Sequence, residues 1–290
     1  MPKPKNTILF LLPWIIILLL FWLFPLVYSF ILSFTKYSVL SGKAEWVGLL
    51  NYLKLLKDPD FWTALKNTSF FVFGTIPFTT AFALILAILV NQKIPWRGFM
   101  RAGFFIPSIT SLVVISLVFI HLYARDGYFN FLLNLLNLPS PEKGFLFSEK
   151  TALLSIMFMD VWIATGYYML LFLAALQAIP VELYEISDTF GANFFQKFRF
   201  VTLPHLRPMF LFVILINTIK SFQIFIEVFV MTKGGPLNST LTMVYLVYDE
   251  GLYKFNFGYA SAVAYVLFFI IMIFSLLQMK TFGLGRGIED

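Results

Sequence analysis

The chain has 290 residues, of which 60% are hydrophobic, 19% aromatic and only 12% charged. In soluble domains roughly a quarter of the residues are charged, so the composition excludes an ordinary soluble protein and predicts a polytopic membrane protein. The formal net charge is +6, but no basic run with interleaved aromatic residues follows a polar face, which argues against nucleic-acid binding. Cysteine is absent and the two histidines lack the spacing of a metal site, so we expect no bound metal.

The first apolar run covers residues 8–33 and follows a short basic segment. It is longer than the roughly 20 residues that a membrane-spanning helix needs. Its length and the lack of a small-residue cleavage site favour a retained helix over a signal peptide. A polar loop at 34–66 follows, with a surface helix expected near 49–56. We therefore treat residues 1–68 as an N-terminal transmembrane helix with an extracytoplasmic loop.

Five further apolar runs predict the remaining spans. We expect them at about 69–90, 101–122, 152–176, 209–231 and 258–279. The connections between them include a turn at 91–97, an exit loop at 123–150 with a helix near 128–137, and a loop at 232–257. The predicted fold class is all-α with six transmembrane helices, and residues 69–290 would form a five-helix core.

Six spans place both termini on the same side of the membrane. The side that carries more Lys and Arg in its short loops is normally cytoplasmic. The two sides carry equal numbers, but five of the six arginines lie on the side of the termini, and the other side has longer loops, which count for little. We expect a multi-pass protein of the cell membrane with both termini in the cytoplasm.

The longest polar interruption in the second half of the chain covers residues 181–208, which we call the elbow segment. Pro180 suits the first turn of a helix and Gly191 suits the left-handed residue past its end, which predicts a helix at about 180–190. Asn193 and Gln196 are typical of a reciprocal N-terminal cap. Because Pro204 disfavours continuation, we expect the second helix to cover only about 194–203.

The first helix of the elbow segment would be apolar on one side and acidic on the other, by helical spacing. Its apolar residues are Leu183, Ile186 and Phe190, and its acidic residues are Glu182, Glu185 and Asp188. Such a helix is suited to docking against another protein. From the pattern alone, an ordinary loop between two membrane helices is an equal alternative.

Charged side chains fall inside two expected spans. They are Asp160 in the fourth and Lys220 and Glu227 in the fifth. At the centre of a membrane helix each would cost about 2.5–3.5 kcal/mol, so none should face lipid. Lys220, Gln223 and Glu227 follow i, i+3, i+7 spacing, which predicts a polar stripe on one helix face. The stripe favours a solute pathway, and a buried clasp with a structural ion pair to Asp160 is the alternative.

Other polar and aromatic residues extend the same pattern. Asn217 and Ser221 lie on the rim of the expected stripe. Trp162, Tyr167 and Tyr168 in the fourth span add aromatic faces beside the acceptors of Asp160. Sugar rings need such surroundings, because they are apolar on the face and form hydrogen bonds at the rim.

The elbow segment resembles the EAA loop in the membrane subunits of ATP-binding-cassette (ABC) importers. The similar residues are Glu185, Gly191 six positions later, Phe198, Leu203-Pro204 and Pro208. The alanines that follow the glutamate in the family are replaced by Ile186 and Ser187, and the aspartate before the glycine is replaced by Phe190. The Glu-to-Gly register is kept.

The resemblance extends over nearly the whole chain. The segments Val47-Gly48, Phe104-Phe105-Ile106-Pro107, Met231-Thr232-Lys233-Gly234-Gly235-Pro236 and Phe257-Gly258-Tyr259-Ala260-Ser261-Ala262 are similar to the carbohydrate and glycerol-phosphate branch of these importers. That branch includes the larger membrane component of the maltose system. The resemblance implies the type I ABC importer permease fold and the import of a sugar, an oligosaccharide or a related polyol or sugar derivative.

The resemblance also implies partners. Members of the family pair with a second homologous permease subunit, bind two copies of a cytoplasmic ABC ATPase and receive substrate from an extracytoplasmic solute-binding protein. ATP and magnesium would be bound by the ATPase, and this chain, which has no GxxxxGK[ST] sequence, would bind no cofactor and catalyse no reaction. The residues implied in ATPase coupling are Glu182, Glu185, Gly191, Phe194 and Phe198; those implied in sugar contact by position are Asp160, Tyr167, Ser221 and Gln223.

Two other functions stay open from the residues. A stand-alone secondary transporter or channel would use Asp160, Lys220 and Glu227 for ion coupling. A membrane enzyme could use Asp160 and Glu227 as acid and base, but no nucleophile, metal cluster or phosphate-binding loop accompanies them.

Overall fold

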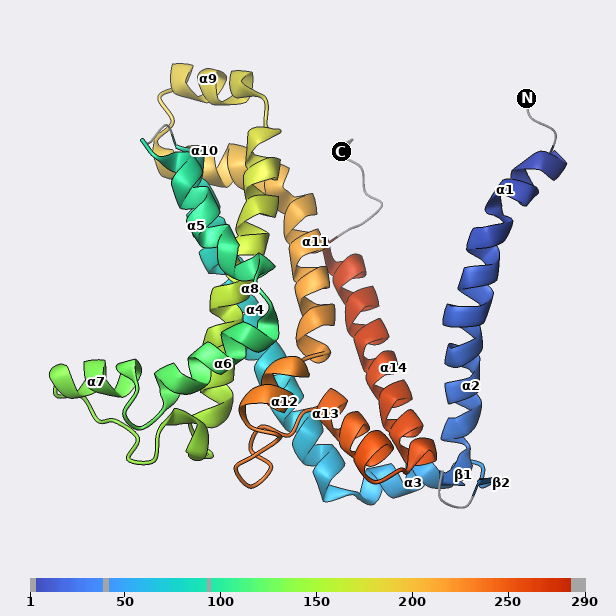
Figure 1. Cartoon of the computed structure of the whole chain (residues 1–290). Coiled ribbons are helices and arrows are strands. Elements are labelled where there is room, and N and C mark those ends of the chain that lie inside the picture. Colours follow the sequence, from blue (N-terminus) through green and yellow to red (C-terminus); the bar gives the residue numbers. More distant parts are fainter. Residues whose placement is uncertain (1–3, 39–41, 93–94, 283–290) are drawn as a thin grey trace. The chain divides into compact units, whose positions relative to one another are not determined.

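The computed structural model describes residues 4–38, 42–92 and 95–282, and most of them are helical (Figure 1). Within these ranges six helical segments are long and apolar enough to cross a membrane. They are Phe10–Ser33, Pro59–Asn91, Leu112–Leu135, Ala152–Gln177, Phe194–Met231 and Phe257–Thr281. The predicted all-α fold with six spans is confirmed.

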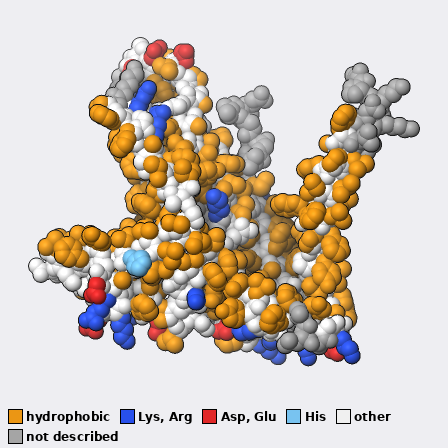
Figure 2. Space-filling view, viewed as in Figure 1, with side chains coloured by type: hydrophobic (Ala, Val, Ile, Leu, Met, Phe, Trp, Pro, Cys, Tyr) orange, Lys and Arg blue, Asp and Glu red, His pale blue; other side chains and the backbone are white. Residues whose placement is uncertain are grey.

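Contacts group the described residues into two compact units. Unit 1 takes Met1–Trp62 and Leu246–Phe268, and unit 2 takes Thr63–Tyr245 and Phe269–Asp290. The boundary expected after residue 68 stays a prediction. The visible surface of the long helices is covered mostly by hydrophobic side chains, with charged side chains mainly near their ends (Figure 2), as lipid contact requires.

Unit 1 begins with the expected first span, which consists of α1 (Pro4–Ile17), a π-helical stretch (Leu18–Leu23) and α2 (Phe24–Ser33). An antiparallel hairpin of β1 (Thr35–Ser38) and β2 (Lys43–Trp46) follows, and it was not expected because strands of four residues are too short to show a pattern. Helix α3 (Leu50–Lys57) lies where the surface helix was predicted.

One polar side chain of α3 fixes this end of unit 1. The buried Asn51 amide donates to the carbonyl oxygens of Ser33 at 2.8 Å and Thr35 at 2.9 Å. Gly258 allows the chain to approach closely, because a Cβ there would overlap the Thr35 carbonyl. The end of the first span and the start of β1 are therefore tied to α3 and to the start of the last span.

Helix α4 (Pro59–Asn91) starts ten residues before the expected second span. Asp58 explains the early start, since its carboxylate accepts the backbone N–H of Asp60 at 2.9 Å and caps the helix. The expected third span is broken into α5 (Arg97–Ile109) and α6 (Leu112–Tyr123). Helices α7 (Tyr128–Leu135) and α8 (Ala152–Gln177) agree with prediction.

The elbow segment forms α9 (Val181–Thr189), α10 (Phe194–Lys197), a π-helical stretch (Phe198–Thr202) and the start of α11 (Leu203–Phe222). Gly191 has φ +69°, and the cap between Asn193 and Gln196 is present in both directions, as expected. The expected helix end at Pro204 is wrong. Proline is tolerated there because it occupies the first turn of α11, directly after the π-helical stretch.

The expected fifth span is also broken, since α11 ends at Phe222 and α12 covers Ile226–Met231. The loop expected at 232–257 contains α13 (Met243–Tyr248) and a π-helical stretch (Asp249–Tyr253). The last span is α14 (Phe257–Phe282).

Two hydrophobic clusters build the core of unit 2, and α8 takes part in both. One cluster includes Phe71, Phe119, Ile156, Met159 and Val228; the other includes Ala83, Ala87, Phe172, Leu206 and Val213. Helix α8 is therefore held on several sides at once, and its polar residues have fixed positions.

Candidate functional site

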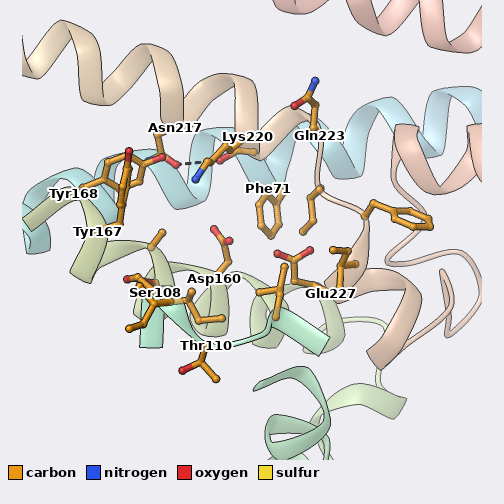
Figure 3. A pocket seen from close by; sticks show the side chains of 18 of the residues that line it. Phe71, Ser108, Thr110, Asp160, Tyr167, Tyr168, Asn217, Lys220, Gln223 and Glu227 are labelled. Atoms are coloured by element: carbon orange, nitrogen blue, oxygen red, sulfur yellow. Dashed lines mark hydrogen bonds between the residues drawn. The ribbon is translucent and has the colours of Figure 1, made fainter. Parts of the chain in front are cut away.

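A cavity of about 760 Å³ lies in unit 2 (Figure 3). Its wall is contributed by α4, the end of α5, the middle of α8, the last turns of α11 and the chain around the start of α12. Its polar lining residues are Ser108, Thr110, Asp160, Tyr167, Tyr168, Asn217, Lys220, Ser221, Gln223 and Glu227. All seven residues that we expected along a solute pathway thus line one cavity.

Helix α8 presents one face to the cavity. Asp160 and Tyr167 are separated by seven residues, which is about two helical turns, so their side chains lie on the same face. The rings of Tyr167 and Tyr168 meet edge to face with centroids 5.3 Å apart. An aromatic wall therefore lies beside an acidic group, whereas Trp162 is not among the residues that line the cavity.

The predicted continuous stripe on the fifth span is wrong. Helix α11 ends at Phe222, and Glu227 reaches the cavity from α12. Packing explains the break, because Ile224 and Val228 are buried in the core cluster around α6 and α8. The Thr242 hydroxyl donates to the Ile224 carbonyl at 3.3 Å, which satisfies an acceptor inside the break.

The three charged residues of the cavity do not form ion pairs with one another. Lys220 places its ammonium 5.0 Å from the centroid of the Tyr167 ring, a cation–π contact. In the described ranges, the ion pairs within 4.0 Å join Lys197 to Asp188 and Lys254 to Asp249 and Glu250. The alternative of a clasp with an ion pair to Asp160 is therefore not formed in this structure.

Two buried polar groups of the lining lack a hydrogen-bond partner within the described residues. Asn217 is 2% exposed, and its Oδ1 accepts from Ser221 at 3.4 Å while its Nδ2 has no acceptor. The hydroxyl of Tyr168, which is 1% exposed, also has no partner. A buried polar group left unsatisfied costs about 1–3 kcal/mol. Both groups belong to residues that line the cavity.

Some lining residues were not expected from the sequence. Ser108 and Thr110 reach the cavity because the third span breaks after Ile109. Ser108 donates to the Ile163 carbonyl at 2.5 Å, which ties the end of α5 to α8. Polar residues close behind Pro107, inside an apolar run, are the signal that could have indicated this break. Among the residues described, no group of three or more His, Asp or Glu side chains could hold a metal ion.

The elbow segment is a second feature of unit 2, and in Figure 1 its helix α9 lies across the ends of α8 and α10. Leu183 and Tyr184 pack against the core, and the Tyr184 hydroxyl lies 2.9 Å from that of Thr202. An ion pair between Lys197 and Asp188 joins the two short helices. The elbow segment is therefore internally braced.

The outer side of the elbow segment is apolar and acidic. Ile186 is 54% exposed and Phe190 is 85% exposed. Of the residues expected to couple to an ATPase, Glu182, Glu185, Gly191 and Phe194 are exposed and Phe198 is half-buried. Of the predicted apolar face, Leu183 packs against the core, whereas Ile186 and Phe190 stay exposed and could contact a partner.

Comparison with known proteins gives the family. No family model matches the chain. The chain is 34% identical over 287 residues to the arabinooligosaccharides transport system permease protein AraP of Bacillus subtilis (strain 168), covering 98% of this chain and 91% of the relative. It is 35% identical over 278 residues to the lactose transport system permease protein LacF of Rhizobium radiobacter, covering 94% of this chain and 92% of the relative.

A solved structure shares the fold. It is a bacterial alginate ABC transporter in complex with an alginate pentasaccharide-bound periplasmic protein, with a TM-score of 0.83, 20% identity and coverage of 94% of this chain and 92% of that chain. The two permease relatives are matched over more than nine tenths of their lengths, so the similarity includes all six spans. The chain belongs to the family of sugar permease subunits of ABC transporters, and it is a multi-pass membrane transport protein rather than an enzyme.

Proposed function

We propose that this permease subunit forms one wall of the path by which a sugar, an oligosaccharide or a related derivative enters the cytoplasm. A second homologous permease subunit forms the other wall, and two copies of a cytoplasmic ATPase drive the cycle. One observation carries the proposal. The elbow segment directly connects α8 and α11, the two helices that supply most of the polar cavity wall.

This connection suggests how movement reaches the solute. Asp160 and Tyr167 lie on α8, and Asn217 and Lys220 lie on α11. Because the elbow segment is braced by the Asn193 cap and the ion pair of Lys197, a displacement of the segment shifts both helices together. The cavity then changes its shape and its access without any chemistry in this chain.

The motor is a separate chain in this proposal. ATP and magnesium are bound by the ATPase, and this subunit binds no cofactor. The docking surface for the ATPase consists of Glu182, Glu185, Gly191, Phe194 and Phe198, with the exposed Phe190 ring beside them. The aromatic side chains provide buried area and the carboxylates provide orientation.

The second permease subunit closes the open side of the cavity. Lys220 and Gln223 line the cavity and are exposed in this single chain, so a neighbouring surface must cover them within the membrane. Both termini and the elbow segment lie in the cytoplasm, which leaves the loop between α6 and α8 outside. A solute-binding protein delivers the sugar there, in line with the substrate-loaded periplasmic protein in the alginate transporter complex.

Reconstitution into liposomes tests the proposal. We expect sugar uptake only when the second permease, the ATPase and ATP are all present. ATP is supplied on the side of the vesicle membrane where the ATPase lies. Uptake by this chain alone, driven by an ion gradient, would instead establish a secondary transporter that uses Asp160, Lys220 and Glu227. If the two permease subunits purify as an active complex that contains no ATPase, the elbow segment has no coupling role.

A further inference from the structure

We propose that the solute carried by this permease bears a positively charged amino group, which Asp160 and Glu227 receive together. The substrate class is then an amino sugar or a glycan that contains one. This inference rests on the proposed function, since it specifies the solute of the same cavity.

The first argument is the charge of the cavity wall. Of the described residues that line the cavity, only Asp160, Glu227 and Lys220 carry a formal charge. If both carboxylates are ionised, two negative charges against one ammonium would leave a balance of −1 inside a membrane protein, and a bound cation would remove it. A buried charge without an opposite charge is unfavourable, because the low-dielectric interior replaces water. The wall by itself therefore favours a cation.

The second argument is where Lys220 lies. Its ammonium is 5.0 Å from the Tyr167 ring centroid and forms no ion pair within 4.0 Å in the part of the chain that the structure describes. In Figure 3 the carboxylates of Asp160 and Glu227 point into the same space, and the Lys220 amino group lies between the two tyrosines and Asp160. The lysine does not neutralise the carboxylates by direct contact.

The third argument compares possible solutes at this position. A glycan ammonium would form charge-assisted hydrogen bonds to both carboxylates, which are stronger than neutral ones. A neutral sugar would offer the two carboxyl groups no positively charged partner. A uronic acid would add a third negative charge and would be repelled by them. The amine is the substituent that fits both groups.

The fourth argument separates a glycan from a bare cation. The exposed side chains of Lys220 and Gln223 line the cavity and carry N–H donors, and a bare cation offers them no acceptor. Hydroxyl and ring oxygens of a sugar do. The Tyr167 and Phe105 rings add apolar faces, and about 760 Å³ lies within the range of about 300–1,000 Å³ usual for small-molecule sites.

Three disaccharides with the same β-1,4 linkage test the inference. They are the glucosamine dimer, the N-acetylglucosamine dimer and cellobiose, which differ in carrying an amine, an acetamide or a hydroxyl group at C2. Binding to the purified assembled transporter is measured by equilibrium dialysis at about pH 6, below the usual pKa of such amines. We expect the glucosamine dimer to bind about tenfold tighter than cellobiose.

Charge-neutral variants of nearly equal shape give the decisive comparison. In Asp160→Asn with Glu227→Gln, the preference for the amine should disappear, because no carboxylate remains to receive it. Glu142→Gln in the exit loop, outside the cavity, should keep the preference. An unchanged elution volume and an unchanged unfolding temperature show that the double variant is folded.

Three results would overturn the inference. They are equal affinity for the three disaccharides, no binding of the glucosamine dimer up to about 10 mM, and a preference that survives in the double variant. Equal affinity would mean that the second permease neutralises the carboxylates. ATPase content and ATP-dependent uptake are measured on the same preparation. A complex without the ATPase would contradict the proposed function. A complex that contains an active ATPase but shows no preference for the amine would contradict this inference alone.

Discussion

Gly166 of α8 packs directly on the backbone carbonyl of Phe104 in α5, so that a Cβ at residue 166 would overlap this oxygen. One turn further along α5, Ser108 donates to the Ile163 carbonyl. The two contacts hold the helices together where Ser108, Thr110 and Tyr167 line the same cavity. A missing side chain at residue 166 thus helps to set the width of the site.

Gly166→Ala should therefore lower the stability of the permease by about 1–3 kcal/mol, because the backbone cannot give way as a flexible side chain could. The loss should appear as a lower unfolding temperature in detergent, followed by intrinsic fluorescence. Gly103→Ala on α5 is the matched control, since an added Cβ there meets no atom within 4 Å. Equal unfolding temperatures for the two variants would contradict the close packing.

Tyr167→Ala should reduce sugar uptake about tenfold while basal ATP hydrolysis persists, because the ring also holds the Lys220 ammonium. Tyr167→Phe is the matched control, since it keeps the ring face, and its uptake should stay near that of the unmodified protein. Initial uptake rates in proteoliposomes provide the measurement.

Gln223→Ala should also lower uptake without stopping basal ATP hydrolysis. The side chain is exposed at the cavity and lies directly after the end of α11. Unchanged uptake kinetics would remove Gln223 from the solute path.

Gly191→Val should uncouple ATP hydrolysis from transport without preventing membrane insertion. The φ angle of +69° at this position is unfavourable for a β-branched residue by about 1–2 kcal/mol, although there is open space for the side chain. Gly191→Asn is the control, because asparagine accepts left-handed conformations. The readout is the ratio of sugar transported to ATP hydrolysed, which should fall only in the valine variant.

Glu185→Lys should weaken attachment of the ATPase, because Glu185 is exposed on the acidic side of α9. The amount of ATPase that co-purifies with the membrane subunits is the measurement. Normal yield together with full coupled activity would refute the docking role of this residue.

Thr242→Val should destabilise the helix break after α11 by about 1–3 kcal/mol, since the buried Ile224 carbonyl would lose its hydroxyl donor. Thr281→Val is the control, because Thr281 is exposed and bonds only within its own helix. Thermal unfolding of both variants would show whether the hydroxyl matters, and similar values would count against it.

The elements that the sequence predicted well depend on local properties. The first, fourth and sixth spans, α9, and the cap between Asn193 and Gln196 were all predicted near their observed positions. A membrane helix satisfies its own backbone hydrogen bonds and needs only a long apolar run. A cap needs only residues a few positions apart.

The prediction of an unbroken fifth span failed because of contacts between residues distant in the chain. The helix expected to continue through Gln223 breaks because Ile224 and Val228 enter the core and Thr242 satisfies a freed carbonyl. The helix end expected at Pro204 is wrong for a different reason: a π-helical stretch directly precedes it, and the chain stays helical. The first outcome depends on distant residues and the second on a local change of helix type.

The sequence by itself determined the membrane class, the six spans and the residue types of the site, because hydrophobic length and the cost of buried charge act on each segment separately. Only the tertiary structure decided that Glu227 lines the same cavity as Asp160 from a different helix, with Lys220 held beside Tyr167. Helix breaks and side-chain partners depend on how distant segments pack, and that packing is a property of the whole chain.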